Sequence, residues 1–356
     1  MATSSKQPNF KRILLIRLSA LGDVAMLPHA VRAFREAYPK VGVTILTRSF
    51  LRPLFDGLDV EFIFVDTDKH HRGFWGLWRL AGEIKAHGVD AVADVHGMIR
   101  SSILRWMCFL RGGIPFRKIY KGRVEKWFRV GYSNHEAVPL THSVVRYCDV
   151  LRRFGYTFDD PSPAKRVVHE SPVGKKSGRW VGFAPFSAHR GKTYPADLSE
   201  QVVGLLSERF DRVFIHSGGG SEAEFAERME SQYPNVTALW DRVKLKEERD
   251  LISNLDCVIT MDSLVMHLAA LVATPTVSVW GATHPEFGFM GYGMDYEGVL
   301  QESMPCRPCS VYGNKPCKSG DYKCLRAITP EMIVERAEYM CSKYGFVECS
   351  VDEQSE

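Results

Sequence analysis

The chain has 356 residues, 45% of them apolar and 25% charged, which is ordinary globular composition and excludes disordered and collagen-like classes. The length predicts two or three domains, and the net charge of +4 is too small to indicate general nucleic-acid binding. The sequence has no apolar stretch long enough for a transmembrane helix. The apolar run at residues 13–16 is short and flanked by arginines, so it is not a signal peptide, and we expect a cytoplasmic chain.

Strand and helix patterns alternate along the first half of the chain. Residues 11–18 form a nearly continuous apolar run, which is typical of a buried parallel strand. Apolar side chains then recur at three- and four-residue spacing over residues 24–38, which predicts a helix with Pro28 in its first turns. We also expect strands over 41–47, 61–65 and 89–95, and helices over 74–86 and 99–110.

A second set of alternating patterns follows a predicted linker. Residues 160–179 contain three prolines, and we expect a linker there with one edge strand at Val167-Val168. Strands are then expected over 180–184, 213–217, 257–260 and 276–280, and helices over 198–210, 222–233, 264–272 and 330–344. The alternation predicts an α/β fold with parallel sheets. We place an N-terminal domain at 1–165, a C-terminal domain at 175–330, and a final helix and tail at 331–356.

The loop that follows the first predicted strand carries a candidate catalytic carboxylate. Gly22 permits a tight turn, and Asp23 stands where a helix begins. A carboxylate at this place can cap the helix by accepting its free amides. In a cleft it can also act as a general base. The residues of the loop alone leave both roles open.

Two loops of the second half have the composition of a phosphate or sugar site. The loop at 183–195 gathers small residues and cations, so its amides and Lys192 can receive phosphate oxygens, or it is a solvated basic turn. The loop at 216–222 has three consecutive glycines, which permit close approach of a ligand. Glu222 either accepts ribose hydroxyls or favours the helix dipole.

Residues 258–270 form a buried strand that ends in Asp262-Ser263, followed by a helix. The free amides of such a helix N-terminus bind anions, and plain capping by either residue is the alternative. His267, one turn into the helix, has apolar neighbours, so its side chain fits the core better than a metal site.

Four cysteines, Cys306, Cys309, Cys317 and Cys324, fall within one loop-rich segment. Four thiolates can hold a structural zinc ion in tetrahedral geometry. The spacing is not that of paired C-x2-C knuckles, so free or redox-linked thiols remain an alternative.

Residues 100–129 carry nine cations and one acidic residue, with aromatic side chains interleaved. This stretch is either a solvated face with buried aromatics or a surface for an anionic membrane or a phosphorylated glycolipid.

Taken together, four segments resemble glycosyltransferase family 9, the lipopolysaccharide core heptosyltransferases. Residues 13–24 are similar to the family's first strand and S-x-x-G-D loop, and residues 94–101 to its D-x-Q-G-x-x-K-S segment. Residues 262–285 are similar to its D-T-G-x-x-H-L-A-A…P…G-x-T-x-P signature, and residues 306–331 to its C-x-x-C…I-x-P-E segment.

The resemblance implies a GT-B fold, in which two Rossmann-like domains face each other across a cleft. It implies an inverting transfer of heptose from ADP-L-glycero-D-manno-heptose to the lipopolysaccharide inner core, with Asp23 as general base and no metal required on the diphosphate. The expected donor-binding residues are Ser187, Lys192, Gly218, Gly219, Glu222, Asp262, Ser263, Leu264 and His267. The expected acceptor-binding residues are Arg17, Ser19, Asp94, His96 and Arg100.

The acceptor implied by the resemblance is an anionic glycolipid, so the enzyme would work at the cytoplasmic face of the inner membrane. Ser263-Leu264 stands where the family has Thr-Gly, and a transferase using another nucleotide sugar is therefore an alternative. A non-catalytic glycolipid-binding protein is the alternative from another functional class. The oligomeric state is not predicted.

Overall fold

The computed structural model describes residues 9–131 and 139–345, which divide into two compact units. Unit 1 comprises Met1–Arg123 and Thr141–Ser162, and unit 2 comprises Val124–Leu140 and Pro163–Glu356. The expected tail beyond residue 345 lies outside the described residues. No helix in the described part of the chain combines the length and apolar character needed to cross a bilayer.

Unit 1 is built on a parallel sheet with strand order β3-β2-β1-β4-β5. Its strands are β1 (Arg12–Ile16), β2 (Gly42–Thr47), β3 (Glu61–Phe64), β4 (Ala91–Asp94) and β5 (Phe116–Lys118). Its helices are α1 (Leu21–Ala25), α2 (Leu27–Ala37), the 3-10 helix η1 (Ser49–Phe55), α3 (Gly73–Ala86), α4 (Ile99–Gly112) and α6 (Ser143–Arg152).

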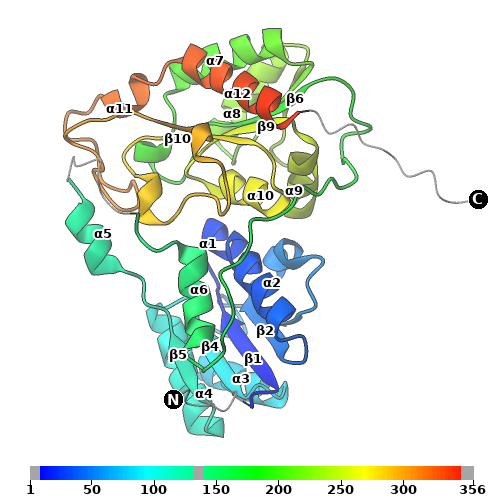
Figure 1. The fold of residues 1–356 in the computed structure, drawn as a ribbon, viewed down its shortest axis with the longest axis vertical. Coiled ribbons are helices and arrows are strands. Elements are labelled where there is room, and N and C mark those ends of the chain that lie inside the picture. Colours follow the sequence, from blue (N-terminus) through cyan, green and yellow to red (C-terminus); the bar gives the residue numbers. More distant parts are fainter. Residues whose placement is uncertain (1–8, 132–138, 346–356) are drawn as a thin grey trace, which may run out of the picture. The chain divides into compact units, whose positions relative to one another are not determined.

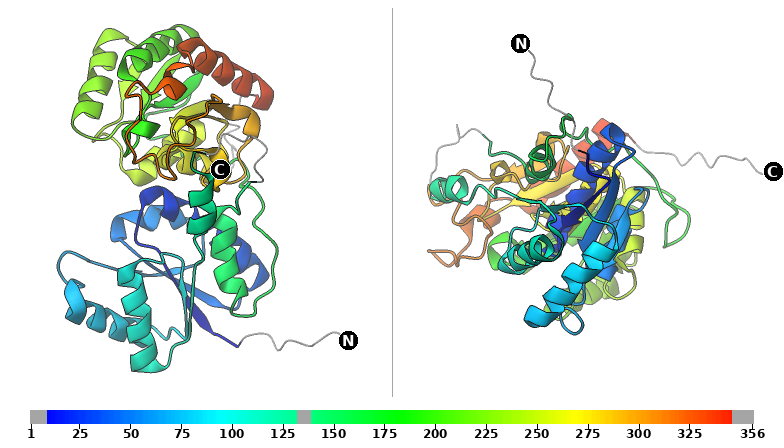
Figure 2. Two further views of the ribbon diagram at one scale, coloured as in Figure 1. Left: turned by 90° about the vertical axis from the view of Figure 1, so that its left-hand side faces the viewer. Right: turned by 90° about the horizontal axis from the view of Figure 1, so that it is seen from below.

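Helices cover both faces of this sheet, as the apolar strands require. Leu14 and Ile16 of β1 lie in one core cluster with residues of α3 and α4, and these two helices pack side by side (Figures 1 and 2). The alternate residues Ile13 and Leu15 are fully buried as well. Helices α2 and α6 pack against each other in the same unit.

Unit 2 is built on a second parallel sheet, with strand order β11-β10-β9-β6-β7-β8. Its strands are β6 (Trp180–Ala184), β7 (Arg212–Ile215), β8 (Val236–Ala238), β9 (Cys257–Met261), β10 (Thr276–Trp280) and β11 (Val299–Gln301). Its α-helices are α7 (Ala196–Arg209), α8 (Ser221–Gln232), α9 (Leu245–Asn254), α10 (Leu264–Val272), α11 (Lys323–Arg326) and α12 (Pro330–Tyr344). The 3-10 helices are η2 (Arg190–Lys192), η3 (Pro285–Phe287) and η4 (Tyr296–Gly298).

The core of unit 2 includes its last helix. Ile333, Ala337 and Met340 of α12 share one buried cluster with strands β6, β7, β9 and β10 and with α7 and α8, and α12 packs beside α7 (Figure 1). The two parallel sheets confirm the α/β class predicted from the alternating patterns.

Helix α5 (Arg123–Arg129) and the chain after it belong largely to unit 2. The Lys126 ammonium lies 4.0 Å from the centre of the Phe289 ring. The Gly131 amide donates to the Pro308 carbonyl at 2.8 Å. These contacts attach residues 124–131 to unit 2, although the chain before them belongs to unit 1.

The predicted linker runs along unit 2 without forming a strand. The edge strand expected at Val167-Val168 was wrong, because the Val167 amide makes one 3.4 Å bond to Val272 and no ladder follows. Instead, the backbone of His169 is fixed to α9: its amide donates to Ser253 Oγ at 2.9 Å, and its carbonyl accepts from Asn254 at 2.9 Å.

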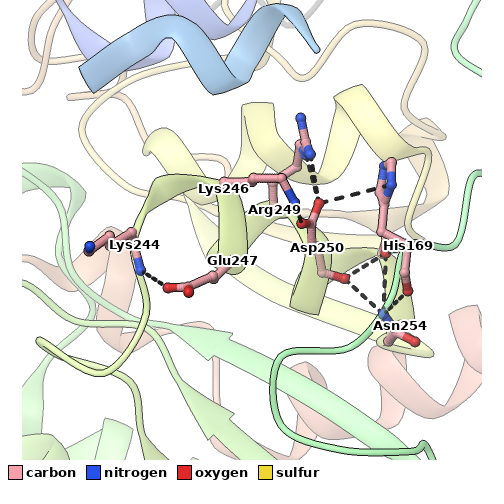
Figure 3. A network of polar contacts seen from close by, with 8 residues as sticks. His169, Lys244, Lys246, Glu247, Arg249, Asp250 and Asn254 are labelled. Carbon is pink, nitrogen blue, oxygen red and sulfur yellow. Dashed lines mark hydrogen bonds and ion pairs between the residues drawn. The ribbon is translucent and has the colours of Figure 1, made fainter. Parts of the chain in front are cut away.

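The polar network in which His169 lies holds a buried carboxylate in α9 (Figure 3). Arg249 donates to Asp250 at 2.7 Å, and Lys246 donates to it at 2.6 Å. Burial alone would raise the pKa of Asp250, but these hydrogen bonds outweigh it and hold the pKa below its ordinary value. The ionised carboxylate therefore stabilises the end of α9 to which the linker is attached.

The helix predicted over 24–38 is divided into α1 and α2 at Met26. Pro28 has no amide hydrogen, so the regular bond back to the Val24 carbonyl cannot form, and a new helix starts with Pro28 in its first turn.

Candidate functional site

Each unit has one place where the loops after two neighbouring central strands diverge to opposite sides of the sheet. In unit 1 this switch point lies between β1 and β4, and in unit 2 it lies between β6 and β9. Ligands of open α/β sheets bind at such points, outside the carboxyl ends of the strands. The loops of Asp23, Asp94, Lys192 and Asp262 follow these four strands, whereas the glycine-rich loop follows β7 and the cysteine-rich loop follows β11.

Asp23 lies in the first turn of α1 rather than at its N-cap. Its carboxylate accepts the backbone amide of Ala20 at 3.2 Å and forms an ion pair with Arg17. The carboxylate therefore does accept an amide at the start of the helix, as the capping alternative predicted. This hydrogen bond engages only one side of the carboxylate. About 31% of the Asp23 side chain remains exposed, so the carboxylate is accessible to a ligand.

Arg17 is buried and is fixed from three directions. Its Nη1 donates to the Val95 carbonyl at 2.6 Å, and its guanidinium lies 5.6 Å from the centre of the Tyr147 ring. Burial alone would lower the pKa of Arg17, but Tyr147 and Asp23 outweigh it and raise the pKa. The Tyr147 hydroxyl also donates to the Asp23 carbonyl at 3.1 Å. Arg17 thus supplies a permanent, immobile positive charge beside Asp23.

His96 and Lys121 lie in the same electrostatic environment. Burial, together with the charges of Arg17 and Lys121, lowers the pKa of His96 to about 4, so its ring is neutral at physiological pH. Its Nδ1 is buried and has no hydrogen-bond partner within the described residues. Burial and the neighbouring Arg17 lower the pKa of Lys121 to about 8. Both side chains interact electrostatically with Asp23.

Asp94 is fully buried at the end of β4 and organises the loop into α4. Its Oδ1 accepts the amides of His96 at 3.1 Å and Gly97 at 2.7 Å. Its Oδ2 accepts Ser101 Oγ and Arg105 Nη1, each at 3.1 Å. Four donors surround this carboxylate, so it shapes the loop that carries His96.

Ser19 and Arg100, the other residues expected to bind acceptor, are both exposed. Ser19 belongs to the loop between β1 and α1, and Arg100 to the first turn of α4. The segments that carry these two residues follow the neighbouring strands β1 and β4 of the sheet of unit 1.

At the switch point of unit 2, the residues expected to bind the donor diphosphate come together. Lys192 Nζ lies 3.2 Å from Asp262 Oδ2, and Ser187 Oγ donates to the Asp262 carbonyl at 3.2 Å. The Thr283 hydroxyl, which follows β10, also donates to the Asp262 carboxylate at 3.2 Å. Asp262 is buried and anchors Lys192 at the end of the sheet.

Helix α10 begins directly after Asp262 with Ser263 as its N-cap residue. The Ser263 side chain makes no capping bond to the helix, and its hydroxyl lies 3.1 Å from Thr260 Oγ1. Leu264, half-buried, is the first residue of the helix, and His267 is buried one turn further on. The first amides of α10 are therefore not capped by Ser263.

The glycine-rich loop after β7 is folded around Glu222. The Gly218 amide donates to Glu222 Oε2 at 2.7 Å. A Cβ at Gly219 would meet the Trp240 ring at 2.8 Å, which accounts for a residue without a side chain there. Glu222 thus shapes the loop, and the exposed Trp240 lies against it.

The cysteine-rich loop packs against the loop that follows β10 and against Lys192. The buried Arg307 donates to the Thr283 carbonyl at 2.9 Å, and the Cys309 amide donates to the Ala282 carbonyl at 2.9 Å. A Cβ at Gly313 would lie 2.5 Å from Lys192 Cγ. The loop therefore supports the position of Lys192.

The four cysteines of this loop are free thiols. Burial raises the pKa of Cys309 to about 11, and the other three cysteines of the loop contribute to the increase. Within residues 9–131 and 139–345, no group of three or more His, Cys, Asp or Glu side chains is arranged to hold a metal ion.

Sequence reasoning missed Tyr147, Arg307 and the role of Lys121. Tyr147 lies in α6, whose buried residues Val144, Tyr147, Cys148 and Leu151 have helical spacing that could have indicated the helix. In the sequence, Lys121 stands out only as one of the nine cations of residues 100–129. Its proximity to Asp23 comes from tertiary structure, and no local pattern reveals it.

Comparison with known proteins identifies relatives of the chain. Residues 77–318 match the family Glycosyltransferase family 9 (heptosyltransferase). The chain is 22% identical to lipopolysaccharide heptosyltransferase 1 of Escherichia coli K12 over 310 residues, which cover 83% of this chain and 93% of that protein.

Solved structures with a similar fold include a glycosyl transferase family 9 protein from Veillonella parvula, with a TM-score of 0.71 and 20% identity. It is matched over 94% of this chain and 98% of that chain. The Escherichia coli heptosyltransferase WaaC with ADP-2-deoxy-2-fluoro heptose matches with a TM-score of 0.61 and 17% identity, over 92% of this chain and 99% of that chain. At these identities the structures support the fold.

Proposed function

Because the chain belongs to glycosyltransferase family 9, the heptosyltransferases, it is a glycosyltransferase, and we propose that it transfers heptose from ADP-L-glycero-D-manno-heptose to the lipopolysaccharide inner core. The observation that carries the proposal is the accessible Asp23 carboxylate, held by a buried cation at the switch point of unit 1. The relative from Escherichia coli, named lipopolysaccharide heptosyltransferase 1, supports this acceptor class.

In the proposed reaction, Asp23 takes the proton of the acceptor hydroxyl. The hydroxyl oxygen forms a bond to the anomeric carbon of heptose from the face opposite ADP. The bond between that carbon and the diphosphate oxygen breaks, so the configuration inverts and ADP leaves. Arg17 and the Ala20 amide fix the orientation of the carboxylate, which limits the entropy lost on reaching the transition state.

Negative charge develops on the departing diphosphate, and unit 2 has groups that can stabilise it. Lys192 supplies a cation, held in place by Asp262. The amides that open α10 supply hydrogen-bond donors and the positive end of a helix dipole. We assign Ser187, Ser263, Leu264 and His267 to the same donor site, with Gly218, Gly219 and Glu222 at the nucleoside end.

We assign the acceptor to unit 1, with Ser19, His96 and Arg100 as its contacts. Arg17 and the buried Asp94 act by positioning Asp23 and the loop of His96, respectively. The neutral, unpartnered Nδ1 of His96 can exchange a hydrogen bond with an acceptor hydroxyl. An anionic glycolipid of the cytoplasmic membrane face suits the cations of this unit.

Leu264 favours one second candidate, a transferase with a different nucleotide sugar. A leucine where the family motif has glycine places a side chain at the first residue of α10. Thermal-shift measurements with ADP-heptose and with UDP-, GDP- and CDP-sugars separate the candidates, because a ligand of the folded state raises the melting temperature. We expect the largest shift with ADP-heptose. A shift with only a non-adenine donor would support the second candidate instead.

The diphosphate assignment is tested by Lys192→Met, which removes the cation but keeps the aliphatic stem. We expect ADP to bind about 10–100-fold more weakly in calorimetric titration, since a hydrogen bond to a charged group contributes about 1.5–3 kcal/mol. Lys175→Met, at an exposed lysine of unit 2, is the matched control for loss of a lysine from that unit. Unchanged ADP affinity in Lys192→Met would refute the assignment.

A further inference from the structure

Helix α4 of unit 1 has an apolar stripe on the side opposite its buried face. Leu104 and Cys108 of the helix pack in the core with α3 and the sheet. Four large apolar side chains occupy the opposite side, at spacings of four, three and four residues, which places them within an arc of about 60°. These are Ile99, Ile103, Trp106 and Leu110, with exposed fractions of 80%, 40%, 52% and 73%.

The stripe is continuous and is held rigidly. The Trp106 ring packs edge-on against Phe116 at 4.9 Å and against Phe109 at 6.0 Å between ring centres. Phe109 is itself exposed beside the stripe. Single exposed apolar residues are common, but a contiguous apolar surface on a soluble unit marks an interaction site.

Positive charge lies along one side of the stripe and on the neighbouring strand β5. From residue 95 to residue 124 the sequence has seven lysines and arginines and no acidic residue. Arg100 and Arg111 are exposed on α4 itself. Arg111 is fixed beside the stripe by α3, since its Nη1 donates to the Trp78 carbonyl at 2.6 Å and its guanidinium lies 4.7 Å from the centre of the Trp78 ring. Arg117 and Lys118 are exposed on β5.

We propose that α4 docks unit 1 on an anionic phospholipid bilayer, with the apolar stripe among the acyl chains and the flanking cations at the phosphates. An apolar helix face bordered by basic residues has the chemistry of an interfacial helix. A second protein surface would have to supply acidic groups to the same cations, whereas an anionic bilayer supplies both the acyl chains and the phosphates.

The docked helix would also bring the acceptor site to the membrane. The stripe begins at Ile99, directly after the loop that Asp94 folds and that carries His96. This consequence rests on the proposed function, because only an acceptor held in the membrane requires its binding site to lie at the membrane surface. Binding of the helix to lipid does not depend on heptose transfer.

The test is flotation of the full chain with phosphatidylcholine vesicles, with and without phosphatidylglycerol, in the absence of donor and acceptor. We expect binding to the anionic vesicles, weakened by salt. The double variant Ile103→Ser, Leu110→Ser should bind them at least about tenfold more weakly, because it removes two large apolar side chains from the surface that would enter the acyl chains. Phe64→Ser is the matched control, since it removes an exposed aromatic ring from β3 of the same unit.

A second arm replaces Trp127 and Phe128 of α5 by serine, because they are also exposed aromatic residues near cations. Equal binding by wild type and the α4 double variant would overturn the proposal, as would loss of binding only in the α5 variant. A wild-type dimer that the α4 substitutions dissociate, without vesicle binding, would show that a second copy covers the stripe. ADP binding and melting temperature are measured for each variant, so a failure of lipid docking is distinguishable from a failure of the proposed function.

Discussion

The two switch points use the same pair of groups in opposite ways. In unit 1 the cation is buried and the carboxylate is accessible: the exposed side-chain fractions are 5% for Arg17 and 31% for Asp23. In unit 2 the carboxylate is the more buried partner, with 9% for Asp262 against 15% for Lys192. The more exposed member of each pair is the one that a ligand would reach first. In the proposed reaction, the first switch point supplies the base, and the second supplies the cation for the diphosphate.

The buried member of each pair has a positioning role. Arg17 is held by Val95 and Tyr147, and Asp262 is held by Thr283. A substitution of the accessible member should therefore affect chemistry or binding, whereas a substitution of a buried member should first affect stability. This difference can be tested by substituting the accessible member and the buried member separately.

The largest effect is expected for Asp23→Asn, which keeps the shape of the side chain but removes its basicity. We expect kcat for transfer to fall about 100- to 10,000-fold, the usual contribution of a general base. ADP affinity should change little, because the proposed donor groups lie in unit 2, whereas the melting temperature should fall moderately, because the buried Arg17 loses its charged partner. Steady-state kinetics and titration with ADP measure the two effects. A kcat within tenfold of wild type would show that Asp23 is not the base.

Asp94→Asn should be the most destabilising change in unit 1. The substitution leaves the buried Arg105 without its charged partner, and loss of one member of a buried ion pair costs about 3 kcal/mol. Urea unfolding followed by fluorescence measures the change. Retention of wild-type stability would contradict the four-donor arrangement around Asp94, and the Asp68→Asn variant serves as an exposed control on the same unit.

Asp262→Asn should have a smaller and mixed effect. We expect a loss of about 1–3 kcal/mol in stability, together with weaker ADP binding, because Lys192 loses the charge that holds it. Asp23→Asn, in contrast, should leave ADP affinity nearly unchanged. If the two substitutions gave the same profile of stability and ADP affinity, the distinction between the two switch points would be lost.

The smallest effect is a pH dependence due to His96. In the unfolded chain this histidine takes up a proton near pH 6.5, whereas in the folded protein its pKa is about 4. Between these values the unfolded state binds more protons, so the contribution of neutral His96 to stability is complete above pH 6.5 and is lost as the pH falls toward 4.

His96→Gln removes this titration and should flatten the decrease in melting temperature between pH 6.5 and pH 4. His70→Gln, at an exposed histidine of the same unit, should leave the decrease as in wild type. Parallel curves for wild type and His96→Gln would mean that His96 is not held neutral.

The sequence was sufficient for the elements with long apolar patterns. Strands β6 and β10 and helices α10 and α12 have the predicted bounds, because buried strands and amphipathic helices of this length leave a clear pattern. Strands β5, β8 and β11 have three residues each, too few to show a period. The attachment of residues 124–140 to unit 2 depends on contacts with Phe289 and Pro308, which are distant in sequence.

The same distinction between local sequence patterns and distant contacts applies to the candidate sites. Asp23, Lys192 and Asp262 could be proposed from the sequence because each belongs to a segment of recognisable composition that follows a predicted strand. Lys121, Tyr147 and Arg307 were not found, because their contacts join segments far apart in the chain. The sequence could also not show that one oxygen of Glu222 is engaged by the Gly218 amide.

The central claim is tested most directly by transfer of radiolabelled heptose from ADP-heptose to a panel of truncated lipopolysaccharide cores. We predict label in at least one inner-core acceptor with the wild-type chain, and none above background with Asp23→Asn. Absence of transfer to every core, from a preparation that binds an acceptor glycolipid but no ADP-heptose, would contradict the account.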